Sequence, residues 1–178
     1  MDIVSHGLWS LVLFKSINLK LKSKKFNLWN AAFWGIFPDL FTFVIPYLIW
    51  IFQMIFENTP LLDSIKIGAT SSDFPYYHLV EILYNISHSI IIFIIIFCVA
   101  WLLFKKPIWI LCGWLLHILF DIFTHIEGHF PTPILWPLSN FKFNGLIYWR
   151  NTWFIIIEIA LLIVVYFIIY TAENKKKN

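Results

Sequence analysis

Residues 113–125 read GWLLHILFDIFTH, and this stretch decides the fold that the sequence predicts. Apolar residues surround it on both sides, which is typical of a helix inside a membrane. Its ionisable residues, His117, Asp121 and His125, are spaced by four. Because four residues make slightly more than one helical turn, all three lie on one face. Two imidazoles and a carboxylate on one face would form about half of a divalent-metal site.

These side chains could instead only hydrogen-bond to neighbouring helices. A functional role is favoured because ionisable groups inside a membrane are costly unless they are paired, protonated or bound to an ion. Gly113 continues the same face of the helix and would let a neighbouring helix approach closely.

The composition is that of an integral membrane protein. Of the 178 residues, 60% are hydrophobic and only 13% are charged, whereas about a quarter of the residues of a soluble domain are charged. We expect an all-α fold, a membrane helical bundle of four to five transmembrane helices in a single domain over 1–178, with the lipid bilayer as partner. The net charge of +3 lies mostly in basic clusters at the membrane edges and gives no case for nucleic acid binding.

Five apolar segments are expected to form the helices. The first is short for a transmembrane span, which needs about 20 residues, and the second contains prolines and should be kinked. A polar loop over 57–81 and a proline-rich loop over 127–151 separate later segments. The expected segments are about 3–17, 28–56, 83–104, 108–126 and 153–170.

Basic residues predict the orientation. The clusters at 15–25, 105–106 and 175–177 fall on one side of the membrane if the five segments alternate in direction. Lysine and arginine are enriched on the cytoplasmic side. We therefore expect a multi-pass protein of the cell (inner) membrane with a basic cytoplasmic tail over 171–178 and both loops outside.

Each segment also brings an ionisable side chain to the middle or outer half of the predicted bundle. We expect these side chains to converge on one polar pocket that opens to the outer side. Imidazoles and carboxylates suit zinc, with manganese or iron as alternatives. The candidates exceed the roughly four ligands of one ion, so either two ions share a bridging carboxylate or the surplus groups orient ligands. The side chains are His6, Asp39, His88, His117, Asp121, His125 and Glu158.

Simpler roles stay open for several of them. Asp39 follows a proline and could cap a helix start, and His88 lies between two serines and could hydrogen-bond across helices. His6 and Asp2 could be solvated residues near the start of the chain. Glu158 could make a structural hydrogen bond.

The order and spacing of these blocks resemble the YdjM-like family of inner-membrane, metal-dependent hydrolases. The resemblance implies a small helical hydrolase with metal-site positions at His6, Asp39, His88, His117 and Asp121. One departure is Leu83-Tyr84, where many members have His-Arg. The order of histidines and aspartates is more distantly similar to zinc-dependent phospholipase C. The matching blocks are Asp2-x-x-x-His6-Gly7-Leu8, Phe37-Pro38-Asp39, Ser87-His88-Ser89, His117-x-x-x-Asp121, Thr124-His125, Phe130-Pro131-Thr132-Pro133 and Trp136-Pro137.

The leading hypothesis is a membrane-bound, metal-dependent hydrolase that cleaves an ester or phosphoester, with a lipid or a small phosphoester as substrate. One or two ions would be bound, with Asp121 as the bridge. His125 would be a ligand of a second ion or the general acid/base, and Glu158 would orient a ligand. The alternatives are a membrane ion or proton pathway and a non-catalytic protein whose helices a metal staples together.

Overall fold

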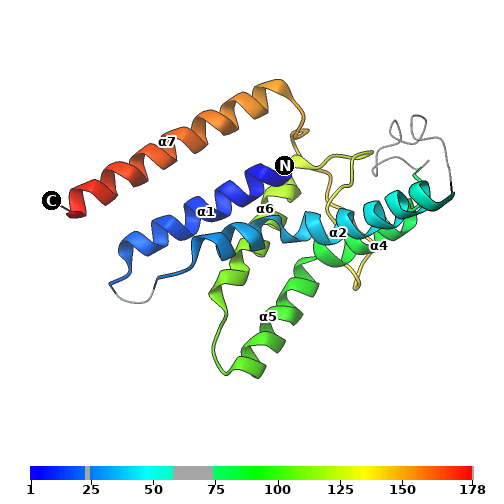
Figure 1. Ribbon diagram of the computed structural model, residues 1–178, viewed down its shortest axis with the longest axis horizontal. Coiled ribbons are helices and arrows are strands. Elements are labelled where there is room, and N and C mark those ends of the chain that lie inside the picture. The colour runs from blue at the N-terminus through cyan, green and yellow to red at the C-terminus, as the bar shows by residue number, and fades with distance from the viewer. Residues whose placement is uncertain (23–24, 58–73, 178) are drawn as a thin grey trace.

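The computed structural model describes residues 1–22, 25–57 and 74–177, and it confirms the all-α class (Figure 1). Within these residues the only β-pairing is an isolated bridge between Thr132 and Phe143. The helices are α1 (Ile3–Lys20), α2 (Leu28–Glu57), α4 (Tyr77–Ser87), α5 (Ile90–Phe104), a short 3-10 helix η1 (Trp109–Leu111), α6 (Cys112–Thr124) and α7 (Thr152–Lys177).

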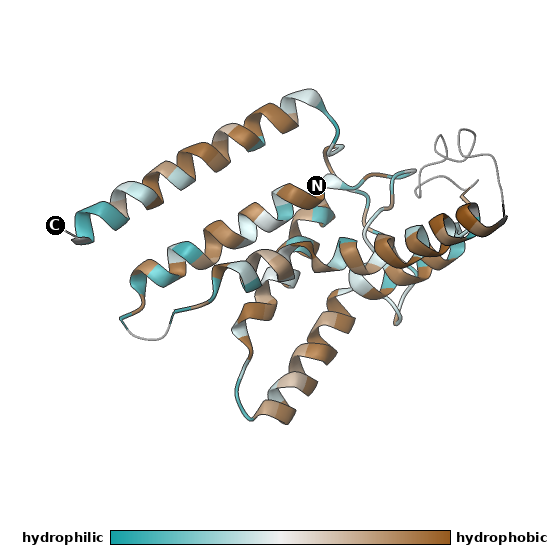
Figure 2. Ribbon diagram, in the orientation of Figure 1, coloured by the Kyte–Doolittle hydropathy of each residue, from teal (hydrophilic) through white to brown (hydrophobic). Residues whose placement is uncertain are grey.

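Among the described residues, two helices are long and apolar enough to cross a membrane: α2 over Leu28–Gln53 and α7 over Thr152–Lys176. Helices α4 and α5 are bent by 58° and make a third candidate if they count as one broken span. Figure 2 shows apolar residues along most of α5 and α7. The sequence predicts four to five transmembrane helices. In the part of the chain that the structure describes, two helices, or three if α4 and α5 form one broken span, are long and apolar enough to cross a membrane. The stretch Trp109–Thr124, which contains α6, is apolar but shorter.

The prediction of one helix over about 83–104 is wrong. The chain instead forms α4 and α5 with a break at His88 and Ser89. The Ser89 side chain accepts a hydrogen bond from the Ile92 amide and so caps the start of α5. The proline-rich loop also stabilises this break, because the Ser89 hydroxyl donates to the Trp136 carbonyl at 2.5 Å.

Helix α5 packs on α6 through one apolar cluster. Phe93 of α5 and Trp114 and Ile118 of α6 are at most 5% exposed. The rest of α5 is apolar all round, and residues such as Ile94 and Leu102 are exposed. A helix with this pattern is stable where its outer surface meets lipid.

The backbones of α1, α2 and α6 approach closely at two glycines. A Cβ atom on Gly113 would lie 2.6 Å from the Ser10 hydroxyl and 3.0 Å from the Ala31 carbonyl oxygen. A Cβ on Gly35 would lie 2.6 Å from the Ser10 Cβ and 2.7 Å from the His6 carbonyl oxygen. The expectation that Gly113 admits a neighbouring helix is confirmed, and the contact lies beside His6.

Gly35→Ala is expected to destabilise the protein, because the new methyl group would overlap backbone atoms that cannot move independently. We expect the free energy of unfolding to fall by about 1–3 kcal/mol and Tm by about 2–12 °C. Thermal unfolding in detergent would measure this. Gly7→Ala is the matched control, since its Cβ would meet the Ile36 Cγ2 methyl at 2.9 Å, and the backbone atom it meets, the Ala32 carbonyl oxygen, is 3.6 Å away. Equal losses in both variants would contradict the packing argument.

Candidate metal centre

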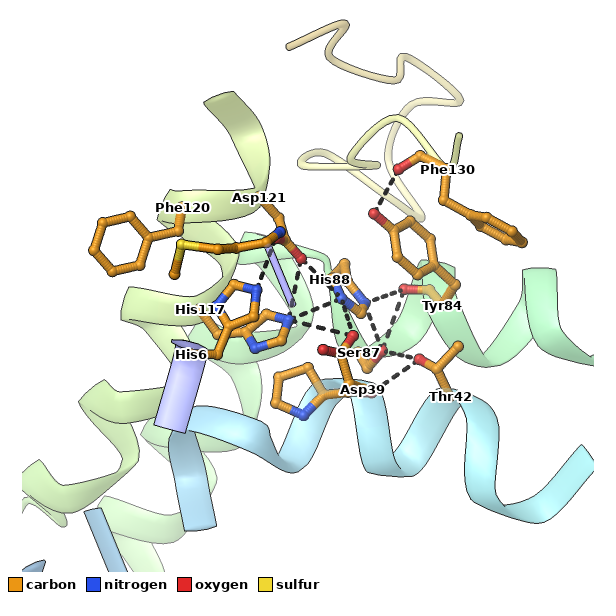
Figure 3. Close-up of polar contacts among 12 residues, drawn as sticks. His6, Asp39, Thr42, Tyr84, Ser87, His88, His117, Phe120, Asp121 and Phe130 are labelled. Atoms are coloured by element: carbon orange, nitrogen blue, oxygen red, sulfur yellow. Dashed lines mark hydrogen bonds and ion pairs between the residues drawn. The ribbon is translucent and has the colours of Figure 1, made fainter. Parts of the chain in front are cut away.

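Four buried side chains meet where α2, α6 and the α4–α5 break come together (Figure 3). Asp39 comes from α2, His88 from the break, and His117 and Asp121 from one face of α6. Each is at most 5% exposed. One potential ligand atom from each side chain lies within 4.8 Å of the others, so the group could hold a metal ion.

The distances within this group suit a small divalent ion. The Nε2 atoms of His88 and His117 are 3.1 Å apart. Asp121 Oδ2 lies 3.3 Å from the first and 3.1 Å from the second, and Asp39 Oδ1 lies 3.6 Å from each. Two nitrogens bound tetrahedrally to zinc at 2.0–2.1 Å would be about 3.3 Å apart. The arrangement therefore needs little change to surround an ion.

Hydrogen bonds orient both imidazole rings. His117 Nδ1 lies 2.7 Å from the Gly35 carbonyl oxygen and donates to it, so Nε2 presents its lone pair to the group. His88 Nδ1 lies 2.8 Å from the Ser87 hydroxyl and 3.3 Å from the Tyr84 carbonyl oxygen. Donation from His88 Nδ1 to this carbonyl likewise leaves Nε2 available. His117 thus presents the tautomer that a metal ligand needs, and His88 presents the same tautomer when its Nδ1–H donates to the Tyr84 carbonyl.

The second oxygen of Asp121 faces a different set of groups. Oδ1 lies 2.9 Å from His6 Nε2 of α1 and 3.4 Å from His125 Nε2, which follows α6. The amino group of Met1 lies 2.7 Å from the same oxygen. The His6 ring also stacks on His117, with centroids 3.6 Å apart. One carboxylate therefore lies between two pairs of histidines.

Several atoms at this centre are buried without a hydrogen-bond partner among the described residues. They are both ring nitrogens of His6, Nε2 of His125 and Oδ2 of Asp121. Buried polar groups are normally satisfied, and leaving them unpaired is costly. The Met1 amino group pairs with Oδ1 of Asp121, but no lysine or arginine in the described part of the chain forms an ion pair with Asp39 or Asp121. A bound cation would satisfy Nε2 of His125, Oδ2 of Asp121 and one nitrogen of His6, so the residues present fit a metal site.

The family model for the YdjM inner membrane protein matches residues 1–177. The chain belongs to the YdjM inner membrane protein family. Comparison with curated proteins and with solved structures gives no match. This match confirms the resemblance to the YdjM family that the order of the sequence blocks indicated. A family of inner membrane proteins is also consistent with the long apolar helices of the structure.

In this YdjM-family chain, the structure brings together six of the seven side chains expected at the site. These six are His6, Asp39, His88, His117, Asp121 and His125. Glu158 lies on α7 outside the four-residue group, is 5% exposed, and accepts a hydrogen bond from the Trp9 indole at 3.3 Å. Its role in orienting a ligand stays a prediction.

Sequence reasoning missed the residues that support the centre. The Tyr84 ring stacks on His88 at 3.9 Å, and its hydroxyl lies 3.0 Å from His125 Nδ1 and 2.6 Å from the Phe130 carbonyl oxygen. Sequence spacing could have revealed two supporting residues, Tyr84 and Gly35, whose carbonyl accepts the hydrogen bond from His117. Tyr84 precedes His88 by four residues, and Gly35 precedes Asp39 by four. Each pair therefore shares a helical face.

Proposed function

We propose that this protein is a membrane-bound hydrolase that uses one or two divalent metal ions to cleave an ester or phosphoester. Zinc is the first choice of metal, with manganese and iron as alternatives. One observation carries the proposal: the Asp121 carboxylate faces His88 and His117 with one oxygen and His6 and His125 with the other. A carboxylate between two sets of ligands is typical of two-metal hydrolytic sites.

The residues divide into two ligand sets. Asp39, His88 and His117 would hold one ion with Oδ2 of Asp121. His6 and His125 would hold a second with Oδ1, in place of the Met1 amino group that lies 2.7 Å from this oxygen. Metal ions in such a site activate water and polarise the group that is cleaved.

His125 has two candidate roles. Tyr84 and the Phe130 carbonyl both lie 3.0 Å from its Nδ1 and hold the ring in place. Its Nε2 points towards Asp121 and has no hydrogen-bond partner among the described residues. That nitrogen would bind the second ion or, if only one ion is present, exchange a proton with the substrate.

The orientation is part of the proposal: a multi-pass protein whose tail over 171–178 is cytoplasmic and whose centre opens to the outer side. The basic ends of α1 and α7 lie together, since Lys15 forms an ion pair with Glu173 at 3.2 Å and Lys176 contacts the Leu19 carbonyl. The centre lies at the other end of α1, around His6. Lysine clusters favour the cytoplasmic side.

A pocket beside the centre favours an enzyme over the two alternatives. Asp39 and His125 both line this pocket, so a molecule outside the centre could reach its edge. A metal that only staples helices would need a closed ligand shell. An ion pathway would need ionisable groups that continue from the centre to the opposite end of the helices, whereas the buried polar residues of α1 beyond His6 are Ser10 and Asn18, which do not ionise.

Metal analysis of the purified protein tests the proposal. After purification with metals supplied, we expect inductively coupled plasma mass spectrometry to find one or two equivalents of zinc, manganese or iron per protein chain. His117→Ala should lower this content by at least half, because it removes a ligand. His78→Ala is the matched control, since its side chain is 86% exposed on α4. Metal-free wild-type protein, or metal-loaded protein that turns over no ester or phosphoester, would contradict the proposal.

A further inference from the structure

A pocket of about 560 Å³ lies against the candidate metal centre. Asp39 and His125 belong to both, so the pocket opens directly onto the centre. Its walls come from four parts of the chain: the start of α1, the middle of α2, the residues after α6 and the residues before α7. A molecule in this pocket could therefore reach the group of histidines and aspartates.

One wall of the pocket is cationic. Arg150 lines it, and this residue is the only arginine in the sequence. The guanidinium lies over the Trp149 ring, 5.2 Å from the centroid, and no carboxylate of the described residues forms an ion pair with it. His129 lines the same pocket and adds further N–H donor capacity. A guanidinium without an anionic partner is well suited to bind a phosphate.

Other residues of the lining are aromatic. Phe43 and Tyr47 line the pocket from α2, inside the candidate span Leu28–Gln53, and Phe130 lines it from the loop after α6. Figure 3 shows Phe130 beside Tyr84 at the edge of the centre. An apolar wall within a membrane-spanning helix suits hydrocarbon.

The position of Arg150 relates these two parts of the lining to the bilayer. The candidate span in α7 begins at Thr152, two residues after Arg150. Trp149 and Trp153 flank this point, and tryptophan is enriched at membrane interfaces. Lipid phosphates lie at the same depth as such residues. Asp2, the acidic residue at the start of α1, also lines the pocket, but its carboxylate accepts hydrogen bonds from Val4 and Ser5.

We propose that the pocket binds a phosphate-bearing lipid, with its phosphate at Arg150 and His129 and the first part of its hydrocarbon against Phe43, Tyr47 and Phe130. An ester bond of this lipid then faces the side of the centre formed by Asp39 and His125. That this bond is the one cleaved rests on the proposed function, whereas the binding of the lipid does not.

Calorimetric titration of the full chain in uncharged detergent tests the binding. A chelator is present, so no turnover occurs. The probe is dioctanoyl phosphatidic acid, compared with dioctanoylglycerol and inorganic phosphate. We expect Arg150→Gln to weaken binding of the phosphatidic acid by about 10- to 100-fold, as for the loss of a charged hydrogen-bond donor, and Arg150→Lys to recover part of it. Dioctanoylglycerol and inorganic phosphate should each bind more weakly than the phosphatidic acid.

Lys142→Gln is the matched control. It removes one positive charge from the same loop, where Lys142 pairs with Glu81 at 2.9 Å, but Lys142 does not line the pocket. Equal binding by Arg150→Gln and wild type, or equal losses in Arg150→Gln and Lys142→Gln, would overturn the proposal. Inorganic phosphate that binds as tightly as the lipid would also overturn it and would identify a soluble phosphate compound as the occupant.

The test separates this inference from the proposed function. Arginine-dependent lipid binding without turnover after metal is added back would contradict hydrolysis and leave the binding site standing. Turnover of a soluble phosphoester, together with lipid binding that Arg150→Gln leaves unchanged, would contradict the lipid site and leave hydrolysis standing.

Discussion

Asp121→Asn is expected to lower kcat/KM for the substrate by about a thousandfold, the largest loss from any single change at the centre. Asparagine keeps the shape of the side chain but removes its charge and one of its two oxygen ligands. Both candidate ions depend on that carboxylate, and each contributes several kcal/mol of charge stabilisation in hydrolytic sites. Initial rates at several substrate concentrations, with metal supplied, would measure the loss.

Glu127→Gln is the control for this prediction. It makes the same change from acid to amide at an exposed position in the loop after α6, so kcat/KM should stay within about twofold of wild type. Asp121→Asn protein that folds, as judged by its Tm and far-ultraviolet circular dichroism, and still turns over substrate at more than a tenth of the wild-type rate would refute the role of Asp121 as a bridge.

Removal of metal by a chelator is expected to lower Tm by roughly 8–16 °C. A ligand present at a thousand times its Kd stabilises the folded state by about 4.1 kcal/mol, and each kcal/mol changes Tm by about 2–4 °C in a chain of this size. The physical cause is the cluster of buried side chains at Asp39 and Asp121, whose charges and lone pairs would lose their cation. Thermal unfolding in detergent, before and after EDTA, would measure the change.

His117→Ala distinguishes a specific effect of the chelator from a general one. This variant lacks a ligand, so EDTA should lower its Tm by much less than that of wild type, and zinc added back should restore only the wild-type protein. An identical Tm of wild-type protein with and without EDTA would show that no ion contributes to its stability.

The face of α6 was predictable because its residues are local in sequence. Spacing by four places His117, Asp121 and His125 on one side of any α-helix, whatever surrounds it. The meeting of α1, α2 and α6 was also predictable in outline, because buried ionisable groups in a membrane protein must find one another or an ion. Gly113 indicated where the helices would approach most closely.

The break at His88 was only partly predictable from the local sequence, where Ser89 is a residue type that caps helix starts. The run Ile90–Ile96 continues the apolar segment, and nothing in it ends a helix. Distant contacts also stabilise the break: the Ser89 hydroxyl donates to the Trp136 carbonyl, and the Ile90 amide donates to the Ile134 carbonyl at 3.1 Å. Those partners lie more than 40 residues later, in a loop without regular structure.

The two-sided placement of Asp121 and the partner of Glu158 were equally hidden. Which oxygen faces which histidine depends on how α1 packs against α6, and helical spacing does not determine that. Glu158 lies in an apolar segment as the other candidates do, yet it accepts its hydrogen bond from Trp9. The distinction requires the three-dimensional arrangement of α1 and α7.

The glycine contacts among α1, α2 and α6 have a kinetic consequence. Because Gly35 and Gly113 let these backbones meet without intervening side chains, the helices that carry His6, Asp39 and Asp121 cannot slide past one another without a steric clash. The proposed ligands are thus held in place before any ion arrives, and little conformational entropy would be lost on its capture. Because Asp39 and His125 also line the adjoining pocket, an ion could enter and leave through that pocket, so neither capture nor release should require the packed helices to separate.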